Sequence, residues 1–319
     1  MSFIKEQIEK YEALDIPQTK ESDFEDFWKV TIEKTKTIPL NIEKELIDYP
    51  ISKITVYDAT YEGLDGTKIH TWILLPPEAK DKKVPVVITY HGAGGSRHTP
   101  SCHSQYVSMG CAVIATDVRM QRGLTGSKTG FTGGSQQGLF IFGILDRDNS
   151  YLYCVITDAL RAIEVALTIP EIDNNKICVQ GGSQGGALSL MTASLRNDVV
   201  ALCMADVPSN CWLEKRVFDG AGGAESISNF LNNNPDKVDI VLKNLSYFDN
   251  INLVDKIKCP SLISLGLKDP VCPPENVYAA CNKITAPKTI IPYPYGKHNG
   301  GDMNHNEVKL QYLKDNFNL

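Results

Sequence analysis

This sequence lacks the features that would place the protein in a membrane or on a nucleic acid. The charged and periodic N-terminus, residues 1–10, offers neither the apolar core of a signal peptide nor a membrane span. No long basic run is present and the net charge is −6, so nucleic acid and anionic membranes are not expected partners. We therefore expect a cytoplasmic protein.

Cysteine pairs and standard metal-binding patterns are also missing. The nine cysteines form no Cys-x-x-Cys motif, and most of them lie inside or beside apolar runs. Their odd number fits reduced, buried thiols better than a disulfide framework. His98, Cys102 and His103 are residue types that bind metals, but their spacing fits no standard zinc pattern. We interpret this cluster as a surface loop and expect neither a metal nor a cofactor.

The distribution of apolar residues predicts an α/β fold built on an open, mostly parallel, doubly wound sheet. Short apolar runs without polar alternation indicate buried strands at 84–90, 111–117, 177–180, 201–206, 261–267 and 288–295. Helical stretches separate several of these runs, at 155–168, 187–195, 275–283 and 307–317. Two further segments are too long for simple connections and are expected to be insertions that form lids or binding walls, at 119–153 and 209–255.

The length of the chain favours one large domain over two small ones, so we expect a single domain over residues 1–319. Apolar and charged residues alternate at helical spacing from residue 2 to about residue 35. This pattern predicts a helical N-terminal extension within residues 1–50. Residues 54–61 and 69–75 then alternate as strands and predict an antiparallel hairpin that opens the sheet.

A glycine-framed serine stands in the turn Gly181-Gly-Ser-Gln-Gly-Gly186. A short apolar run precedes this turn and a helix-forming stretch follows it, which is the context of a G-x-S-x-G nucleophile elbow. Gly181 and Gly185 let the strand and the helix approach closely while the serine takes a strained conformation. Ser183 is therefore the candidate nucleophile. The alternative is a glycine-rich turn whose serine is an ordinary N-cap.

A serine nucleophile needs a histidine to accept its proton and a carboxylate to orient that histidine. In an α/β-hydrolase the acid and then the histidine follow the serine, at the carboxyl ends of strands. Asp269 and His298 each follow a predicted strand in that order, so they are the predicted acid and base. Asp206 also ends a strand, and it is either the rival acid or a structural carboxylate. The remaining histidines lie in an early strand, before the nucleophile or too late in the chain: His70, His91, His98, His103 and His305.

Ester hydrolysis also needs two N–H donors for the oxyanion of the tetrahedral intermediate. One donor should be the backbone N–H of Gln184, directly after the nucleophile, and the other should come from the loop after the third strand. That loop is Tyr90-His-Gly-Ala-Gly-Gly95, and we assign the second donor to the backbone N–H of Ala93. The alternative is a plain glycine turn.

Longer motifs occur along nearly the whole chain and point to one family. They are Asp23-Phe-Glu-Asp-Phe-Trp28, Tyr90-His-Gly92, Gly143-Ile-Leu-Asp146, Asp158-Ala-Leu-Arg-Ala162, Gly181-Gly-Ser-Gln-Gly-Gly186, Leu245-Ser-Tyr-Phe-Asp249 and Cys272-Pro-Pro274. In these motifs the sequence resembles the acetyl xylan esterases and cephalosporin C deacetylases of carbohydrate esterase family seven. The resemblance implies an α/β-hydrolase fold with a family-specific insertion, and metal-free deacetylation of small acetylated sugars and of cephalosporin C. It also implies a ring-like homo-hexamer, the triad Ser183, Asp269 and His298, and Gln184 and Ala93 at the oxyanion positions.

Three positions depart from the pattern of that family. Its Arg-Gly-Gln motif is here Arg119-Met120-Gln121, its His-Glu pair is His298-Asn299, and its oxyanion-loop tyrosine is Ala93. Ala93 donates through its backbone, so the chemistry is retained at that position. The changes therefore concern the range of substrates and acyl chains, and the assembly, rather than the class of reaction.

The sequence thus predicts a serine carboxylesterase that removes acetyl groups from acetylated sugars such as xylo-oligosaccharides, and from cephalosporin C-like esters. One alternative is a general short-chain esterase or peptidase on the same fold, since a fold does not fix a substrate. Another is a catalytically silent binding protein. The presence of a nucleophile, an acid and a base argues against the silent protein.

Overall fold

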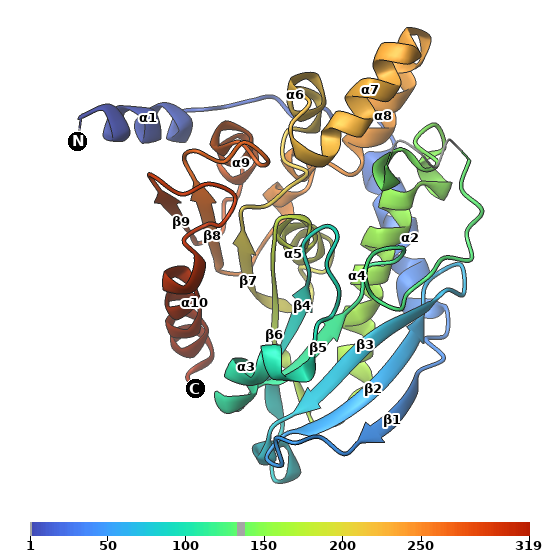
Figure 1. Cartoon of the computed structure of the whole chain (residues 1–319), viewed down its shortest axis with the longest axis vertical. Coiled ribbons are helices and arrows are strands. Elements are labelled where there is room, and N and C mark those ends of the chain that lie inside the picture. The colour runs from blue at the N-terminus through green and yellow to red at the C-terminus, as the bar shows by residue number, and fades with distance from the viewer. Residues whose placement is uncertain (1, 133–137) are drawn as a thin grey trace.

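The computed structural model describes residues 2–132 and 138–319, and a twisted β-sheet runs through its centre (Figure 1). Among these residues the sheet has the strand order β1-β2-β3-β5-β4-β6-β7-β8-β9. The strands are β1 (Glu43–Ile47), β2 (Thr55–Glu62), β3 (Lys68–Leu75), β4 (Val84–Tyr90), β5 (Ala112–Thr116), β6 (Ile172–Gly182), β7 (Val200–Asp206), β8 (Ser261–Gly266) and β9 (Lys288–Tyr293). The pairs from β1 to β5 along this order are antiparallel, and the pairs from β5 to β9 are parallel. The predicted α/β fold with a mostly parallel sheet is confirmed.

Helices cover both faces of the sheet and enclose two apolar cores. One core includes side chains from α2 (Phe24–Thr37), α4 (Tyr151–Thr168), α5 (Gln184–Leu195) and α9 (Pro274–Cys281). The core on the other face includes side chains from α3 (Ser104–Ser108) and α10 (Asp302–Phe317). Every residue of β4, β5 and β8 is buried, as expected of parallel strands that are covered on both faces.

The helical N-terminal extension predicted from the pattern of residues 2–35 contains two helices rather than a continuous one. Two helices, α1 (Ser2–Glu12) and α2, are separated by residues 13–23, which are not helical. Pro17 lies in this gap, and proline cannot supply the N–H that a continuous helix needs. Figure 1 shows α1 at one side of the molecule and α2 at the other, joined by an extended segment.

The predicted N-terminal extension, residues 1–50, also contains a strand that was not expected. β1 pairs antiparallel with β2 and forms the edge of the sheet. Its side chains stay largely exposed, and Glu43, Lys44 and Glu45 are charged. Charged residues are common on edge strands because they discourage pairing with other chains. Because these residues are charged, the segment has no alternation of apolar and polar residues from which a strand could be predicted. The hairpin expected after it is present as β2 and β3.

The two predicted insertions have different structures. Residues 209–255 contain three helices that lie together at the top of Figure 1: α6 (Leu213–Asp219), α7 (Glu225–Asn233) and α8 (Val238–Ser246). In residues 119–153 the described part contains only short single-turn helices before α4 begins at Tyr151, and positions 133–137 lie outside the described residues. We propose that the whole chain is one domain, because strands that begin at residue 43 and end at residue 293 share one sheet.

Arg161 of α4 holds the C-terminal end of α2 against the sheet. Its guanidinium group is buried and donates hydrogen bonds to the backbone carbonyl oxygens of Ile38 (2.9 Å), Pro39 (2.7 Å) and Thr35 (3.2 Å). It also donates to the carbonyl oxygen of Glu62 in β2. Carbonyl groups at the end of a helix have no partner within that helix, so this side chain supplies their hydrogen bonds and fixes α2 against the sheet. No helix within the described ranges has the length and apolar character needed to cross a bilayer.

Candidate active site

Ser183 occupies the sharp turn between β6 and α5. Its backbone has φ 58° and ψ −117°, a conformation that costs a residue with a side chain about 1–3 kcal/mol. Hydrogen bonds hold the turn in place: the Ser183 N–H donates to the Asp206 carbonyl oxygen (2.8 Å), and the Ser183 carbonyl oxygen accepts from the N–H groups of Ala187 (2.9 Å) and Ser209 (3.0 Å). The surrounding structure therefore compensates for the strain and presents the hydroxyl above the sheet.

Glycine is required on both sides of Ser183 because the β4 backbone passes very close to the turn. A Cβ atom at Gly185 would lie 1.9 Å from the carbonyl oxygen of Tyr90, and one at Gly181 would lie 2.3 Å from the same oxygen. These are clashes with backbone atoms that cannot rotate away. The close approach explains why the sequence has glycine at both positions.

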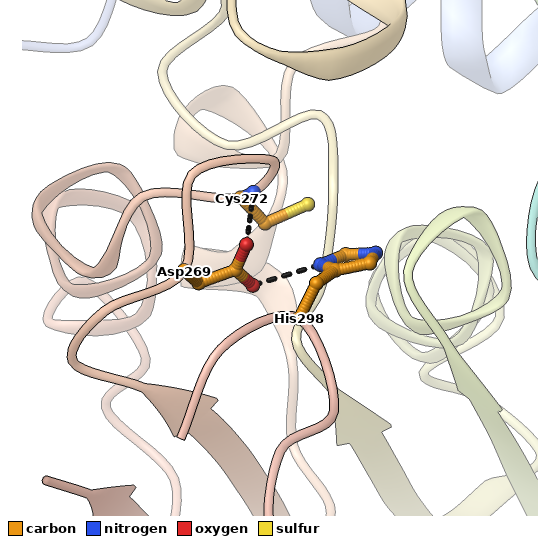
Figure 2. Close-up of side chains that lie close together, drawn as sticks. All are labelled: Asp269, Cys272 and His298. Atoms are coloured by element: carbon orange, nitrogen blue, oxygen red, sulfur yellow. Dashed lines mark hydrogen bonds and ion pairs between the residues drawn. The ribbon is translucent and has the colours of Figure 1, made fainter. Parts of the chain in front are cut away.

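The structure brings Ser183, His298 and Asp269 into one chain of hydrogen bonds. His298 Nε2 lies 2.9 Å from Ser183 Oγ, and His298 Nδ1 lies 2.8 Å from Asp269 Oδ2. Figure 2 shows the Asp269 carboxylate directed at the imidazole. The serine, the acid and the base come from the carboxyl ends of β6, β8 and β9, where catalytic groups gather in open α/β sheets.

The Asp269 carboxylate is held from its own loop. Its Oδ1 atom accepts hydrogen bonds from the backbone N–H groups of Val271 (2.8 Å) and Cys272 (3.0 Å), and its side chain is fully buried. Because Oδ1 is occupied in this way, Oδ2 faces His298. The hydrogen bond that the His298 ring donates to Asp269, with a smaller contribution from the Cys272 thiol, raises the pKa of His298 from 6.5 to about 9. The carboxylate thus makes the imidazole a stronger base.

Asp206, the rival acid, contacts other groups. Its carboxylate lies 2.6 Å from Lys309 Nζ and 3.0 Å from His305 Nε2, and it accepts a hydrogen bond from Ser264 Oγ (2.9 Å). Burial opposes ionisation of Asp206, but His305 and Lys309 outweigh it and lower the pKa of Asp206 to about 2. The side chain of His305 is itself buried in α10, and its Nδ1 atom lies 2.9 Å from Tyr293 Oη. The structure therefore pairs Asp269, and not Asp206, with His298.

The two predicted oxyanion donors lie on segments that one side chain connects. Gln121 accepts a hydrogen bond from the backbone N–H of Gly94 (2.7 Å), next to Ala93, and donates to the side-chain oxygen of Gln184 (2.9 Å). Gln121 also donates to Tyr151 Oη (2.9 Å). Gln184 is the first residue of α5, where backbone N–H groups have no partner within the helix. Gln121 therefore fixes the oxyanion loop relative to the start of α5.

Arg119 and Met120 position this glutamine. The Arg119 guanidinium is buried and makes paired contacts with Asp158 (2.7 and 2.8 Å) and Asp65 (2.8 and 3.1 Å). Met120 has φ 59°, in the left-handed region that favours glycine. The Arg119-Met120-Gln121 stretch thus keeps a glycine-like backbone at Met120.

His91 fixes the start of the oxyanion loop. Its Nε2 atom accepts a hydrogen bond from the backbone N–H of Val118 (2.8 Å), so the proton is on Nδ1, which donates to the Gly92 carbonyl oxygen (2.8 Å). The neighbouring cluster is only partly the surface loop predicted from sequence. His98 and Cys102 are exposed, whereas His103 is buried and its Nε2 atom lies 2.9 Å from the Arg97 carbonyl oxygen. That backbone contact explains why a polar ring is buried there.

Two cavities meet at Ala93. One, of about 810 Å³, is lined by Ser183 and His298 and by many polar groups from the loop before α3, from the turn that contains Asn299, and from α10, which supplies Asn306. The other, of about 480 Å³, is lined by Ala93, Met120, Phe140 and residues that precede α7. Ser183, the predicted nucleophile, thus opens onto the more polar of the two cavities, and Ala93 of the predicted oxyanion loop lines both.

Two residues near the site were not expected from the residue pattern. Gln121 lies in a glycine-rich segment without periodicity, so spacing alone gave no reason to select it. The thiol of Cys272 is buried against His298, in a chain that has several buried cysteines in apolar runs. The only signals were the family motifs that contain these two residues.

Comparison with protein families and known proteins gives a consistent result. The family model described as acetyl xylan esterase (AXE1) matches residues 1–316. Acetyl esterase Axe7A from Xylanibacter ruminicola is 31% identical over 292 residues, which are 88% of this chain and 64% of that protein. The chain therefore spans somewhat less than two thirds of the length of that relative.

Two solved structures are similar to this one over nearly their whole length. The acetyl xylan esterase from Paenibacillus sp. R4 has a TM-score of 0.92 and 32% sequence identity, and the match covers 96% of this chain and 98% of that one. Acetyl xylan esterase 1 from Thermoanaerobacterium sp. JW/SL YS485 has a TM-score of 0.90 and 28% identity, with 97% and 98% covered. With its α/β-hydrolase fold and a family match over residues 1–316, the chain belongs to the acetyl xylan esterase (AXE1) family.

Proposed function

We propose that the protein is a serine esterase that removes acetyl groups from acetylated sugars, such as xylo-oligosaccharides, and from cephalosporin C-like esters. The observation that carries the proposal is the hydrogen-bonded chain from Ser183 through His298 to Asp269, with both contacts shorter than 3 Å. The membership of an acetyl xylan esterase family supports the acetyl group as the one removed. The polar cavity beside Ser183 suits a hydroxylated alcohol such as a sugar.

The proposed reaction has two halves. Ser183 Oγ attacks the acetyl carbonyl carbon while His298 Nε2 takes the hydroxyl proton, and the N–H groups of Gln184 and Ala93 stabilise the oxyanion. His298 then gives the proton to the departing sugar oxygen, which leaves an acetyl-serine. In the second half, His298 takes a proton from water, which attacks the same carbonyl carbon. His298 then gives this proton to Ser183 Oγ as the bond between that oxygen and the acetyl carbon breaks, which releases acetate and restores the serine. Asp269 keeps the other imidazole proton on Nδ1 and stabilises the imidazolium.

The partners of the protein are also part of the proposal. The substrate is a small acetylated carbohydrate, and the reaction needs no cofactor or metal because serine, histidine and aspartate supply the nucleophile and the proton transfers. A homo-oligomer, a hexamer by family resemblance, stays a prediction.

Replacement of Ser183 by alanine tests the nucleophile. Ser183→Ala should reduce turnover of p-nitrophenyl acetate by about a million-fold with an unchanged fold, because the triad acts as a unit. Ser194→Ala is a matched control, since Ser194 lies in α5, the helix that follows Ser183, and its hydroxyl donates to the backbone carbonyl oxygen of Leu190. If Ser183→Ala retains more than about one per cent of the native activity, another residue is the nucleophile. If the native protein itself has no esterase activity, the protein is the catalytically silent binding protein.

Paired substitutions separate the two aspartates. Asp269→Asn should lower turnover by roughly ten-thousand-fold with little change in melting temperature, because the amide favours the wrong imidazole tautomer. Asp206→Asn should act mainly on stability, because it leaves the buried Lys309 without its closest anion. Steady-state kinetics and thermal unfolding of both variants provide the measurements. The reverse pattern would assign the acid to Asp206.

The pH profile tests the role of the carboxylate in the base. Only neutral His298 can accept the serine proton, and Asp269 raises the pKa of His298 from 6.5 to about 9. The value of kcat/KM should therefore rise with pH through a midpoint above 6.5 and towards 9. In Asp269→Asn the midpoint of the residual activity should fall back towards 6.5, with Ser183→Ala as the blank for uncatalysed hydrolysis. A native midpoint at or below 6.5, or one that the substitution leaves unmoved, contradicts this role.

The cavity beside Ala93 predicts a wider acyl range than acetyl. Met120 and Phe140 line this cavity but leave about 480 Å³, and each buried methylene contributes up to about 0.8 kcal/mol. That is roughly fourfold per carbon at most, so propionyl and butyryl esters should compete with acetyl. A kinetic series of p-nitrophenyl esters from acetyl to hexanoyl, on the native enzyme and on Ala93→Tyr, measures the effect. If the native rate falls steeply after acetyl and Ala93→Tyr leaves the profile unchanged, the enzyme is a strict deacetylase.

A further inference from the structure

A cysteine completes a set of three metal-ligand side chains at the candidate active site. One potential ligand atom each from Asp269, Cys272 and His298 lies within 4.8 Å of the other two. Figure 2 shows the three side chains converging, with the sulfur on the same side of Asp269 as the imidazole. Throughout residues 2–132 and 138–319 no other trio of histidine, cysteine and acidic side chains meets this criterion. The set is therefore specific to this place in the fold.

The proposed hydrolysis makes no use of the Cys272 thiol. The backbone N–H of Cys272 supports Asp269, but any residue other than proline provides that group. The thiol itself is buried, with an exposed fraction of 2%. Cys272 belongs to the larger apolar core, and its sulfur also lies beside the His298 imidazole and the Asp269 carboxylate. A thiol, an imidazole and a carboxylate at one point form a typical donor set for zinc.

The spacing of the three groups suits a tetrahedral ion. Zinc binds sulfur, nitrogen and oxygen at about 2.0–2.3 Å, which places ligand atoms roughly 3.3–3.6 Å apart. The 4.8 Å limit on the present separations leaves only small side-chain shifts to reach that arrangement. The side chain of His298 is 28% exposed and lines the larger cavity, whereas Asp269 and Cys272 are buried behind it. A bound ion would therefore reach solvent through His298, on the side where a water molecule can take the fourth position.

We propose that Asp269, Cys272 and His298 form an inhibitory site for a thiophilic divalent cation of the zinc and cadmium type. Magnesium and calcium are not expected to bind, because they prefer oxygen ligands and this set contains sulfur and nitrogen. The effect on activity rests on the proposed esterase function. The binding itself does not, since it depends only on the three side chains.

Occupation of the site would remove the base. Nδ1 faces Asp269 and Nε2 faces Ser183, so the ion binds His298 through Nδ1. The Nδ1 proton then moves to Nε2, and the thiol proton passes to solvent as the thiolate binds the ion. An imidazole with its proton on Nε2 cannot accept the proton of Ser183. The ion also takes Asp269 away from its role as hydrogen-bond acceptor, so hydrolysis stops without any chemical change to the nucleophile.

Cobalt binding and zinc inhibition test the proposal on the full-length protein. Co²⁺ should give the thiolate-to-metal charge-transfer absorption in the near ultraviolet with the native protein and with Ser183→Ala, and not with Cys272→Ala. Zn²⁺ should inhibit p-nitrophenyl acetate hydrolysis, and a chelator should restore the activity. The rate of each variant with zinc is compared with the rate of the same variant without metal. The inhibition constant for zinc should be at least about tenfold higher in Cys272→Ala, because even the loss of a residue that only supports a metal ligand lowers metal affinity by about that factor.

Cys102→Ser is the matched control, because Cys102 is an exposed thiol beside the same cavity. It should leave both the inhibition and the cobalt absorption unchanged. Cys272→Ser keeps the size of the side chain and provides a second variant in case Cys272→Ala misfolds. It should show the same loss of cobalt absorption and the same weaker zinc inhibition as Cys272→Ala. Equal zinc inhibition of native and Cys272→Ala proteins, or a native protein without the cobalt absorption, overturns the proposal. A cobalt signal in a protein without esterase activity supports the metal site and rejects only the esterase function.

Discussion

The contact between the Gly185 backbone and the carbonyl oxygen of Tyr90 sets the geometry of the nucleophile turn. Because a Cβ atom at Gly185 would come within 1.9 Å of that oxygen, β4 and the start of α5 can be this close only with glycine there. The strain at Ser183 is then balanced by backbone hydrogen bonds to Asp206 and Ser209. The turn also places the loop after β4 beside the serine, so the same contact fixes both the predicted nucleophile and the loop that carries a predicted oxyanion donor.

A second constraint is Gln121, which fixes the relative position of the two segments that carry the predicted oxyanion donors. Neither Ala93 nor Gln184 can position the other, since they lie on separate elements. Gln121 bonds to the neighbour of the first and to the side chain of the second, and the buried Arg119 anchors its segment to Asp158 and Asp65. The backbone of Met120 is left-handed, a conformation that favours glycine, which is the residue at this position in the Arg-Gly-Gln motif that Arg119-Met120-Gln121 resembles. Here the conformation is kept and a long side chain is added to the wall of the smaller cavity.

The sequence predicted those parts of the structure that depend on local patterns. Apolar runs identified the parallel strands, and the order of serine, acid and histidine at strand ends selected Asp269 and His298, which the structure brings together with Ser183. Features that depend on tertiary contacts were not predictable. The charged residues of β1 show no apolar alternation, so this edge strand was not predicted. The hydrogen bonds of the Gln121 side chain join segments that are distant in the sequence. His103 is buried where its ring contacts a backbone carbonyl oxygen. The orientation of the Cys272 thiol likewise follows from the turn after β8, not from spacing.

The two aspartates at neighbouring strand ends show how environment assigns different roles to one residue type. Asp206 lies beside Lys309 and His305, so its negative charge is already compensated and it can add little to another imidazole. Asp269 is buried with backbone N–H groups on one oxygen and His298 on the other. A buried carboxylate without a neighbouring cation interacts strongly with any group that can share its charge. The proton on His298 Nδ1 would meet that need during the proposed hydrolysis, and a zinc ion would meet it more fully. The arrangement that makes Asp269 suitable to orient a base is therefore the same one that makes it suitable as a metal ligand once a thiol stands beside it.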